Sequence, residues 1–360
     1  MIKTSRKLLS AVVLTVSLLY LPNGFLSIEA QSNNQKNPNV RTFDVLERPE
    51  DVKAYWTAER MAAAKPTPLP VSPVSSKHAP SNVEIGQKPQ EIPRNADPDC
   101  RRPGRPNPCE VTAANMCVGG AAGFGYPGPT NINATLVPDP TKYPYCSMGK
   151  LFYTVNNQNW VCSAAAVSEF VFLTAGHCLW NPDAHTVSKN ILFVAQYNSP
   201  SQQRFTAAKP GIFQEWAVDR DLDFDIGLVR TNESMKAIGN LALIVGDFTF
   251  HSCCPYAAGY PAQAPFDGAK LYQAYGTWTG NDLTYTLGMN GNNMTPGSSG
   301  GPWFGVQIYP VTGPVAHPQT AWILGLNSYS HGSSPPMYSP EMRFPVADLW
   351  YCINRPGPGC

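Results

Sequence analysis

The chain has 360 residues, of which 43% are hydrophobic and 14% are charged, and its formal net charge at pH 7 is +1. The lysines and arginines form no long basic stripe, so the charge pattern argues against a nucleic-acid partner and against an anionic membrane surface. The length suffices for one or two domains and leaves the oligomeric state unknown.

The first 30 residues have the pattern of an export signal. Three basic residues within the first seven precede a mostly apolar run over residues 8–21, and the small residue Ala30 follows at a plausible cleavage point. The run is shorter than the roughly 20 apolar residues that span a bilayer. Ten cysteines favour disulfides in an exported chain. We therefore expect a signal peptide over residues 1–30 and a secreted protein, extracellular or periplasmic, that has no membrane partner after the signal is removed.

Residues 31–117 are dense in proline, asparagine and charge, most clearly over residues 65–70. Proline removes backbone donors and favours extended conformers, so this stretch is expected to be a largely irregular pro-segment or linker. One helix interrupts the pattern. Pro49 suits a first helical turn, and apolar residues up to Trp56 share a face until Lys65 and the proline after it stop the pattern.

From about Tyr145 onward, short apolar runs alternate with clusters of Gly, Pro, Asn and Ser. Many short strands at such spacing predict an all-β barrel or sandwich. A short C-terminal helix is expected after Pro345. The runs lie at residues 150–155, 160–167, 170–174, 191–197, 226–230, 270–278, 283–287, 303–308 and 322–326.

His177 follows an apolar strand and lies in a Thr-Ala-Gly turn, which exposes an imidazole at the end of a rigid element. An isolated histidine is more often structural than catalytic. Cys178 comes directly after it and Cys162 lies on the preceding strand, so we expect a disulfide that fixes this loop. The alternative is a metal site, but adjacent side chains diverge and no C-x-x-C pair is present, so no metal is expected.

Asp225 heads an apolar strand, so its carboxylate is expected at the rim of a core, where it needs a hydrogen-bonding partner. An imidazole N–H meets that need, and the acid then fixes the tautomer whose other nitrogen can accept a proton. The nearby Asp219, Asp221 and Asp223 are interpreted as solvated loop acids.

Ser299 is flanked by Gly297, Gly300 and Gly301, which permit a tight turn and a close approach of the backbone to a substrate. A serine hydroxyl is a poor nucleophile unless a base lies beside it and N–H groups can meet an oxyanion. Alone, this would be an ordinary Gly/Ser loop. The three motifs in the order His, Asp, Ser argue against coincidence.

Together, the three motifs resemble those of the chymotrypsin-like serine peptidases. Their amino-acid sequences are closest to the secreted bacterial branch of the V8 glutamyl endopeptidase. The similarity covers roughly residues 145–352 and implies two six-stranded antiparallel β-barrels with the site in the cleft between them. We place the N-terminal barrel at residues 118–250 and the C-terminal barrel at residues 251–360.

The resemblance also implies roles for the residues. Ser299 attacks the scissile carbonyl of a peptide or protein substrate, His177 takes and returns the proton, and Asp225 orients His177. The N–H groups of Gly297 and Ser299 form the oxyanion hole. No cofactor is required. These assignments imply that the protein is a secreted serine endopeptidase that is made as a zymogen.

Two features depart from the family pattern. In trypsin-type members, activation cleavage frees an N-terminal amine, which pairs with an aspartate just before the nucleophile. Ser298 takes the place of that aspartate here, so activation by such a pairing is not expected. The determinants of Lys, Arg or Glu preference are missing as well. The substrate pocket is expected to be uncharged and to favour an uncharged side chain of small or medium size; it would be bounded by Asn293, Met294, Asn327, Ser328, Tyr329 and Ser330.

Two other functions stay open at this point. The first is a catalytically inactive homologue in which the barrels serve as an extracellular binding module, although such a module need not keep an intact triad. The second is a metal-dependent hydrolase around His251, Cys253 and Cys254, whose spacing matches no recognised zinc pattern.

Overall fold

The computed structural model describes residues 39–70, 90–91, 134–245, 255–279, 282–307, 320–331 and 336–354. All of them belong to one compact unit that begins at Lys36. The expected signal peptide and the cluster around His251 lie outside the described residues. No helix within the described ranges is long and apolar enough to cross a membrane.

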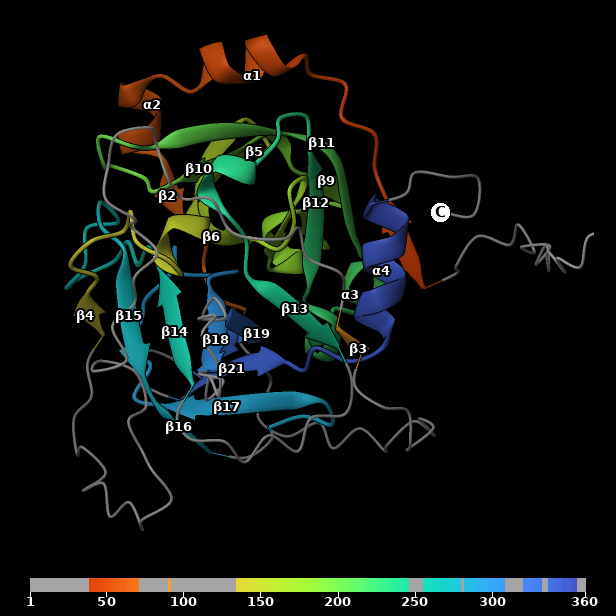
Figure 1. Cartoon of the computed structure of the whole chain (residues 1–360). Coiled ribbons are helices and arrows are strands. Elements are labelled where there is room, and N and C mark those ends of the chain that lie inside the picture. Colours follow the sequence, from red (N-terminus) through yellow and green to blue (C-terminus); the bar gives the residue numbers. More distant parts are fainter. Residues whose placement is uncertain are drawn as a thin grey trace, which may run out of the picture. The chain divides into compact units, whose positions relative to one another are not determined.

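The first half of the fold is a closed barrel of six antiparallel strands (Figure 1). Strand β11 pairs with both β10 and β12, which closes the ring. Its interior is filled by large apolar side chains such as Phe172 and Phe193, which are fully buried. The strands, in their order around the barrel, are β10 (Lys189–Ala195), β5 (Met148–Val155), β6 (Gln158–Ala166), β7 (Val171–Thr174), β12 (Gly227–Thr231) and β11 (Gln203–Phe213).

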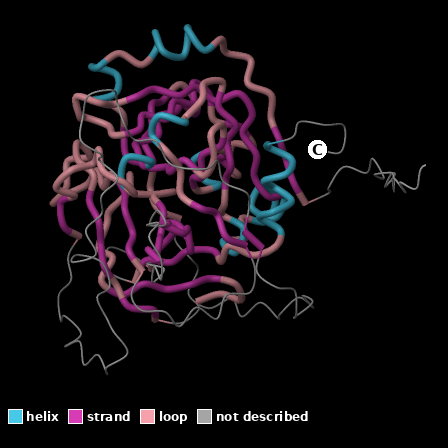
Figure 2. Tube along the Cα trace, viewed as in Figure 1, coloured by secondary structure: helices cyan, strands magenta, loops and turns pink. Residues whose placement is uncertain are grey.

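The second half contributes two further sheets. One runs β3 (Gln90–Glu91), β13 (Ala242–Val245), β19 (Thr320–Leu326), β18 (Pro302–Gln307), β14 (Tyr256–Gly259), β15 (Tyr272–Tyr275) and β4 (Thr135–Leu136). The other runs β16 (Thr277–Trp278), β17 (Thr286–Asn290), β21 (Met337–Pro340) and β20 (Tyr329–Ser330). Strands are the most common regular element of the described chain (Figure 2). The predicted all-β class is confirmed.

The predicted C-terminal helix is present as α4 (Pro345–Asn354), which starts at its proline and lies against β11 and β12 (Figure 1). Its buried face includes Leu349 and Ile353. These side chains approach β11 at Gly211, where a Cβ atom would collide with Ile353. The glycine therefore allows the helix to pack closely on the barrel.

Residues 39–70 pack on the first barrel (Figure 1). Strand β1 (Val40–Thr42) extends the sheet at β11, and helices α1 (Pro49–Tyr55) and α2 (Ala58–Ala63) follow. We expected a single helix here. Thr57 divides it, because its side chain caps the second helix by accepting the N–H of Arg60. Between the helices, Trp56 is fully buried and donates its Nε1–H to the carbonyl of Asn190 at 2.6 Å.

Shorter elements complete the described chain. Strand β2 (Lys65–Pro66) pairs in parallel with β6. A small hairpin is formed by β8 (Trp180–Asn181) and β9 (Thr186–Val187), and helix α3 (Gln214–Asp219) follows β11. Single 3-10 turns lie at Tyr145–Ser147, Gly176–Cys178, Leu222–Phe224 and Lys236–Ile238.

Candidate active site

His177 and Asp225 form a buried hydrogen-bonded pair at the end of the first barrel. His177 lies in the 3-10 turn directly after β7, and Asp225 comes just before β12. Because β7 pairs with β12, with Thr174 opposite Gly227, the two side chains meet. The carboxylate accepts the backbone N–H of His177 at 2.7 Å, and its second oxygen lies 2.7 Å from Nδ1 of the ring.

This pairing defines the imidazole's chemistry. With a carboxylate at Nδ1, the ring is held in the tautomer that donates from Nδ1 and can accept a proton at Nε2. Asp225 is fully buried, so its charge depends on its partners. Ser328 supplies another by donating its hydroxyl to the carboxylate at 2.5 Å. The carboxylate therefore has three donors.

The neighbouring loop acids have other roles. Asp221 accepts the backbone N–H of Asp223 at 3.0 Å, and Asp223 accepts that of Tyr285 at 3.0 Å. Asp219 is exposed. Backbone N–H groups bind the carboxylates of Asp221 and Asp223, and neither carboxylate contacts the His177 pair.

The loop that carries Ser299 is held against the first barrel. The carbonyl of Ser299 accepts the N–H of Ser163 on β6 at 2.7 Å, and the hydroxyl of Ser163 donates to the carbonyl of Gly297 at 2.9 Å. Gly300 has a φ of +78°, and a Cβ atom there would collide with Thr174 and Ala175, just before His177. The glycine thus permits the nucleophile loop to touch the loop of the histidine.

Two atoms in this region lack partners. The hydroxyl of Ser299 and Nε2 of His177 are both buried, and neither forms a hydrogen bond to any described residue. Buried polar atoms are nearly always satisfied, so two unpartnered atoms on loops that touch point to a functional role. A hydroxyl can donate a proton, and an imidazole nitrogen that carries none can accept one.

A disulfide joins Cys162 on β6 to Cys178, directly after His177. Sγ of Cys178 lies 4.0 Å from the carbonyl oxygen of Ser299. The two sulfur atoms and a ring nitrogen of His177 lie within 4.8 Å of one another, a separation that would suit a metal ion. Because a metal needs free thiolates, the disulfide rules out this cluster as a metal site.

The remaining N–H groups of the loop separate into two sets. Those of Ser298, Gly300 and Gly301 donate to the carbonyls of Thr295, Asn327 and Ser298. Those of Gly297 and Ser299 donate to no acceptor among the described residues. The two groups predicted for the oxyanion hole are therefore available to an incoming oxygen atom.

Asn327 was predicted to line the substrate pocket, and the structure gives its side chain a different environment. Its Nδ2 donates to the carbonyls of Ser298 at 3.1 Å and Ala258 at 3.4 Å. Its Oδ1 accepts from Asn292 at 2.8 Å and from Trp303 at 2.7 Å. All four contacts point inward, so the side chain fixes the nucleophile loop. An amide directly after an apolar strand that ends at Leu326 is the sequence signal that could have indicated this.

The other five residues predicted to line the pocket contact different parts of the structure. Met294 belongs to an apolar cluster with Trp303, and Asn293 accepts the N–H of Ala134 at 2.6 Å. Tyr329 stacks on a tyrosine and donates its hydroxyl to Asp282 at 3.0 Å, and its burial raises the pKa of its phenol.

Ser330 is buried, with 6% of its surface exposed, and Ser328 is fully buried and contacts Asp225 as described. His331, beside this strand, pairs with Asp282 at 2.8 Å. The imidazole of His331 is therefore engaged with a carboxylate.

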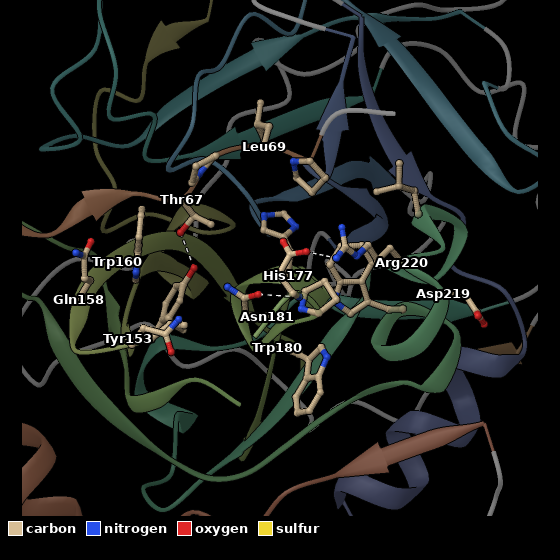
Figure 3. A pocket seen from close by; sticks show the side chains of 18 residues that line it. Thr67, Leu69, Tyr153, Gln158, Trp160, His177, Trp180, Asn181, Asp219 and Arg220 are labelled. Atoms are coloured by element: carbon tan, nitrogen blue, oxygen red, sulfur yellow. Dashed lines mark hydrogen bonds and ion pairs between the residues drawn. The ribbon is translucent and has the colours of Figure 1, made fainter. Parts of the chain in front are cut away.

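A cavity of about 880 Å³ opens beside His177 (Figure 3). Its walls come from the first barrel and its loops, and from residues 67–70 of the upstream segment. Figure 3 shows Thr67 bonded to the hydroxyl of Tyr153, with Leu69 nearby. Burial raises the pKa of Tyr153. None of the six predicted pocket residues lines this cavity.

Residues 143–313 match the model of the trypsin family. The match covers 171 of the 360 residues, so this part of the chain is similar to the trypsin family. No curated protein matches the chain. A solved Glu endopeptidase in complex with MPD has 14% identity and a TM-score of 0.50 over 63% of this chain and 99% of its own, which shows the same fold.

Two other solved proteases are similar to this chain in sequence. The thermostable serine protease AL20, from an extremophilic microorganism, has 27% identity, covers 58% of this chain and 98% of its own, and has a TM-score of 0.48. Protease Anisep from Arthrobacter nicotinovorans has 27% identity, covers 57% of this chain and 94% of its own, and has a TM-score of 0.45.

Proposed function

We propose that the protein is a secreted serine endopeptidase that hydrolyses peptide bonds in peptide or protein substrates. The observation that carries the proposal is the unpartnered hydroxyl of Ser299 in the loop held against the buried His177–Asp225 pair. The match of residues 143–313 to the trypsin family model supports the same class of reaction. The closer assignment to the V8 branch rests on sequence motifs alone.

In the proposed mechanism, Ser299 Oγ attacks the carbonyl carbon of the scissile bond while Nε2 of His177 takes its proton. Asp225 stabilises the imidazolium that forms. The N–H groups of Gly297 and Ser299 bind the oxyanion, each contributing roughly 3–4 kcal/mol to lowering the barrier. His177 then gives its proton to the leaving amine. Water next attacks the acyl carbon while His177 takes its proton, and His177 returns that proton to Ser299 Oγ as the ester bond breaks and the acid leaves.

The proposal includes the organisation of the chain. Residues 1–30 are a signal peptide, residues 31–117 a pro-segment, and residues 118–250 and 251–360 the two barrels. A disulfide in the described part fits an oxidising compartment. N-terminal sequencing of secreted material tests the processing; a fully active form that keeps residues 31–117 would contradict the pro-segment.

A fluorophosphonate probe tests the reaction class. We expect an adduct on Ser299 in the processed protein, located by peptide mass spectrometry, and none in Ser299→Ala. An inactive homologue that acts as a binding module, or a metal-dependent hydrolase, would form no adduct at this residue.

A further inference from the structure

Residues 65–70 of the upstream segment are anchored on the edge of β6. Strand β2 pairs with β6 so that Pro66 lies opposite Val161. The backbone N–H of Thr67 donates to the carbonyl of Val161 at 3.1 Å, and the hydroxyl of Thr67 donates to the same oxygen at 2.9 Å. The hydroxyl also contacts the buried Tyr153. An extended peptide is thus bound at the residue before Cys162.

From Thr67 the segment continues along the candidate active site. Residues 67–70 line the same cavity as His177 (Figure 3). Leu69 is half-buried and packs against an apolar cluster of the second half of the fold, which consists of Ala257, Ala274, Met289, Met294, Trp303 and Met337. The segment therefore connects the strand that carries the disulfide with the cluster that contains Met294, a predicted pocket residue.

The composition of residues 65–70 suits a peptide that binds in the groove and is not hydrolysed there. Prolines at 66, 68 and 70 hold the chain extended before binding, so little conformational entropy is lost. The bonds from Thr67 to Pro68 and from Leu69 to Pro70 have proline nitrogens, which lack an N–H and restrict the residue before them. A leucine between two prolines thus presents its side chain without an ordinary peptide bond after it.

The segment is also tethered close to the groove. Trp56, nine residues before Lys65, is fully buried, and its carbonyl accepts from Arg204 at 2.5 Å. A short, fixed tether raises the effective concentration of the residues that follow.

We propose that residues 65–70 are an intramolecular inhibitor that occupies the peptide-binding groove, and that this groove takes a leucine-sized apolar side chain where Leu69 lies. The inference rests on the proposed peptidase function. It defines the substrate class as extended peptides with an uncharged, medium-sized apolar residue at that position, and it gives the upstream segment a regulatory role.

The test compares four full-length proteins before any processing: the parent chain, Leu69→Asp, Thr67→Val and Leu46→Asp. The Leu69→Asp variant places a charge against an apolar cluster. Thr67→Val removes the hydroxyl contacts and keeps the volume. Leu46→Asp is the matched control, because Leu46 lies in the same segment and is 90% exposed. Two quantities are measured: the rate of fluorophosphonate labelling at Ser299 and the hydrogen exchange of the Thr67 amide.

We expect slow labelling and slow amide exchange in the parent chain and in Leu46→Asp. In Leu69→Asp, labelling should be faster by about tenfold or more, because the fraction of open grooves rises, and the Thr67 amide should exchange rapidly. Thr67→Val should change both rates in the same direction by a smaller factor.

Equal labelling rates in the parent chain and Leu69→Asp would overturn the inhibitor and leave the peptidase intact. Rapid exchange at Thr67 in the parent chain would overturn the occupied groove. If amide exchange responds to Leu69→Asp but no variant is labelled at any stage, the proposed function fails and the inhibitor fails with it.

The substrate class has its own measurement. A peptide library treated with the released enzyme should be cut mainly after leucine or similar apolar residues. Dominant cleavage after glutamate, lysine or arginine would overturn the assignment of the Leu69 position.

Discussion

Ser298 and Ser299 are adjacent and fully buried, yet their hydroxyls differ. The hydroxyl of Ser298 donates to the carbonyl of Thr295 at 2.9 Å, whereas that of Ser299 has no partner among the described residues. The first hydroxyl contributes to the shape of the loop. The hydroxyl of Ser299 makes no such contribution to the loop.

Ser299→Ala should therefore abolish peptide hydrolysis and leave the fold intact. Losing a triad member typically leaves a rate only about 10³–10⁴ above that of water. Ser298→Ala should be much milder, because the backbone N–H of Ser298 also bonds to Thr295. Measurements of kcat/KM with circular dichroism check both variants. A dead Ser298→Ala beside an active Ser299→Ala would contradict the assignment.

Asn327 should act as a positioning residue for the nucleophile loop. Replacing it by leucine removes the bond to the Ser298 carbonyl, so we expect kcat to fall by about tenfold to a hundredfold with little change in KM. Asn240→Leu is the matched control, because Asn240 is a buried amide in the first half that bonds to Val167. If both variants lose stability and neither loses kcat, the role of Asn327 is structural only.

At this scale, the sequence predicted a histidine after one apolar strand and an aspartate before another, and the structure has His177 after β7 and Asp225 before β12. The catalytic roles of these residues and of Ser299 stay predictions. The pocket-lining role of Asn327 stays a prediction, and the hydrogen bonds of its side chain to the nucleophile loop were not predicted. Its partners Ala258 and Trp303 come from strands distant in the sequence. A single sequence carries no signal for which strands will be neighbours, so such a network stays hidden until the fold is known.

The disulfide is the clearest feature at the scale of elements. It closes a loop with a sequence separation of 16 residues, and a loop of about 15 residues contributes roughly 3 kcal/mol to the free energy of unfolding in the chain-entropy model. The double variant Cys162→Ala, Cys178→Ala should be destabilised by about that amount in denaturant unfolding. Peptide mapping without reduction checks the pairing, and either cysteine found free or joined elsewhere would refute it.

The elements upstream of the first barrel were predicted from the sequence only in part. The start of a helix at Pro49 followed from its proline and acidic first turn, and the structure has it there. The composition of residues 31–117 predicted no core. Trp56 is nevertheless buried, because the first barrel supplies the apolar surface that the segment lacks. A pattern within one segment cannot show that another part of the chain will cover it.

At the scale of the whole molecule, Lys150 connects the two halves. It lies on β5 with 5% exposure, and its ammonium group donates to the carbonyl of Gly268 at 2.8 Å. The rings of Phe152 and Tyr197 are within 5.3 Å and 4.9 Å of the ammonium group. Burial lowers the pKa of Lys150 from 10.5 to about 8, and the charge of Asp267 opposes that shift.

The free energy of unfolding should therefore rise with pH above about 8. Between the folded pKa and the unfolded value of 10.5, the unfolded chain binds more protons than the folded one, which favours folding as protons are removed. The gain should reach about 2–3 kcal/mol as pH approaches 10. Lys150→Met should remove this rise. Urea unfolding of both proteins from pH 7.5 to 9.5 measures it, and parallel curves would contradict the shift.

Three consecutive residues of β6 hold the site together. Val161 binds the upstream segment, Cys162 is bonded beside the histidine, and Ser163 holds the nucleophile loop. Successive side chains of a strand face opposite ways, so one extra residue inserted before Val161 would exchange those faces and separate all three contacts at once. The placement of His177, the Ser299 loop and residues 65–70 thus depends on the register of this one strand. Substitutions at the exposed start of β6 should be tolerated, whereas a one-residue insertion there should not.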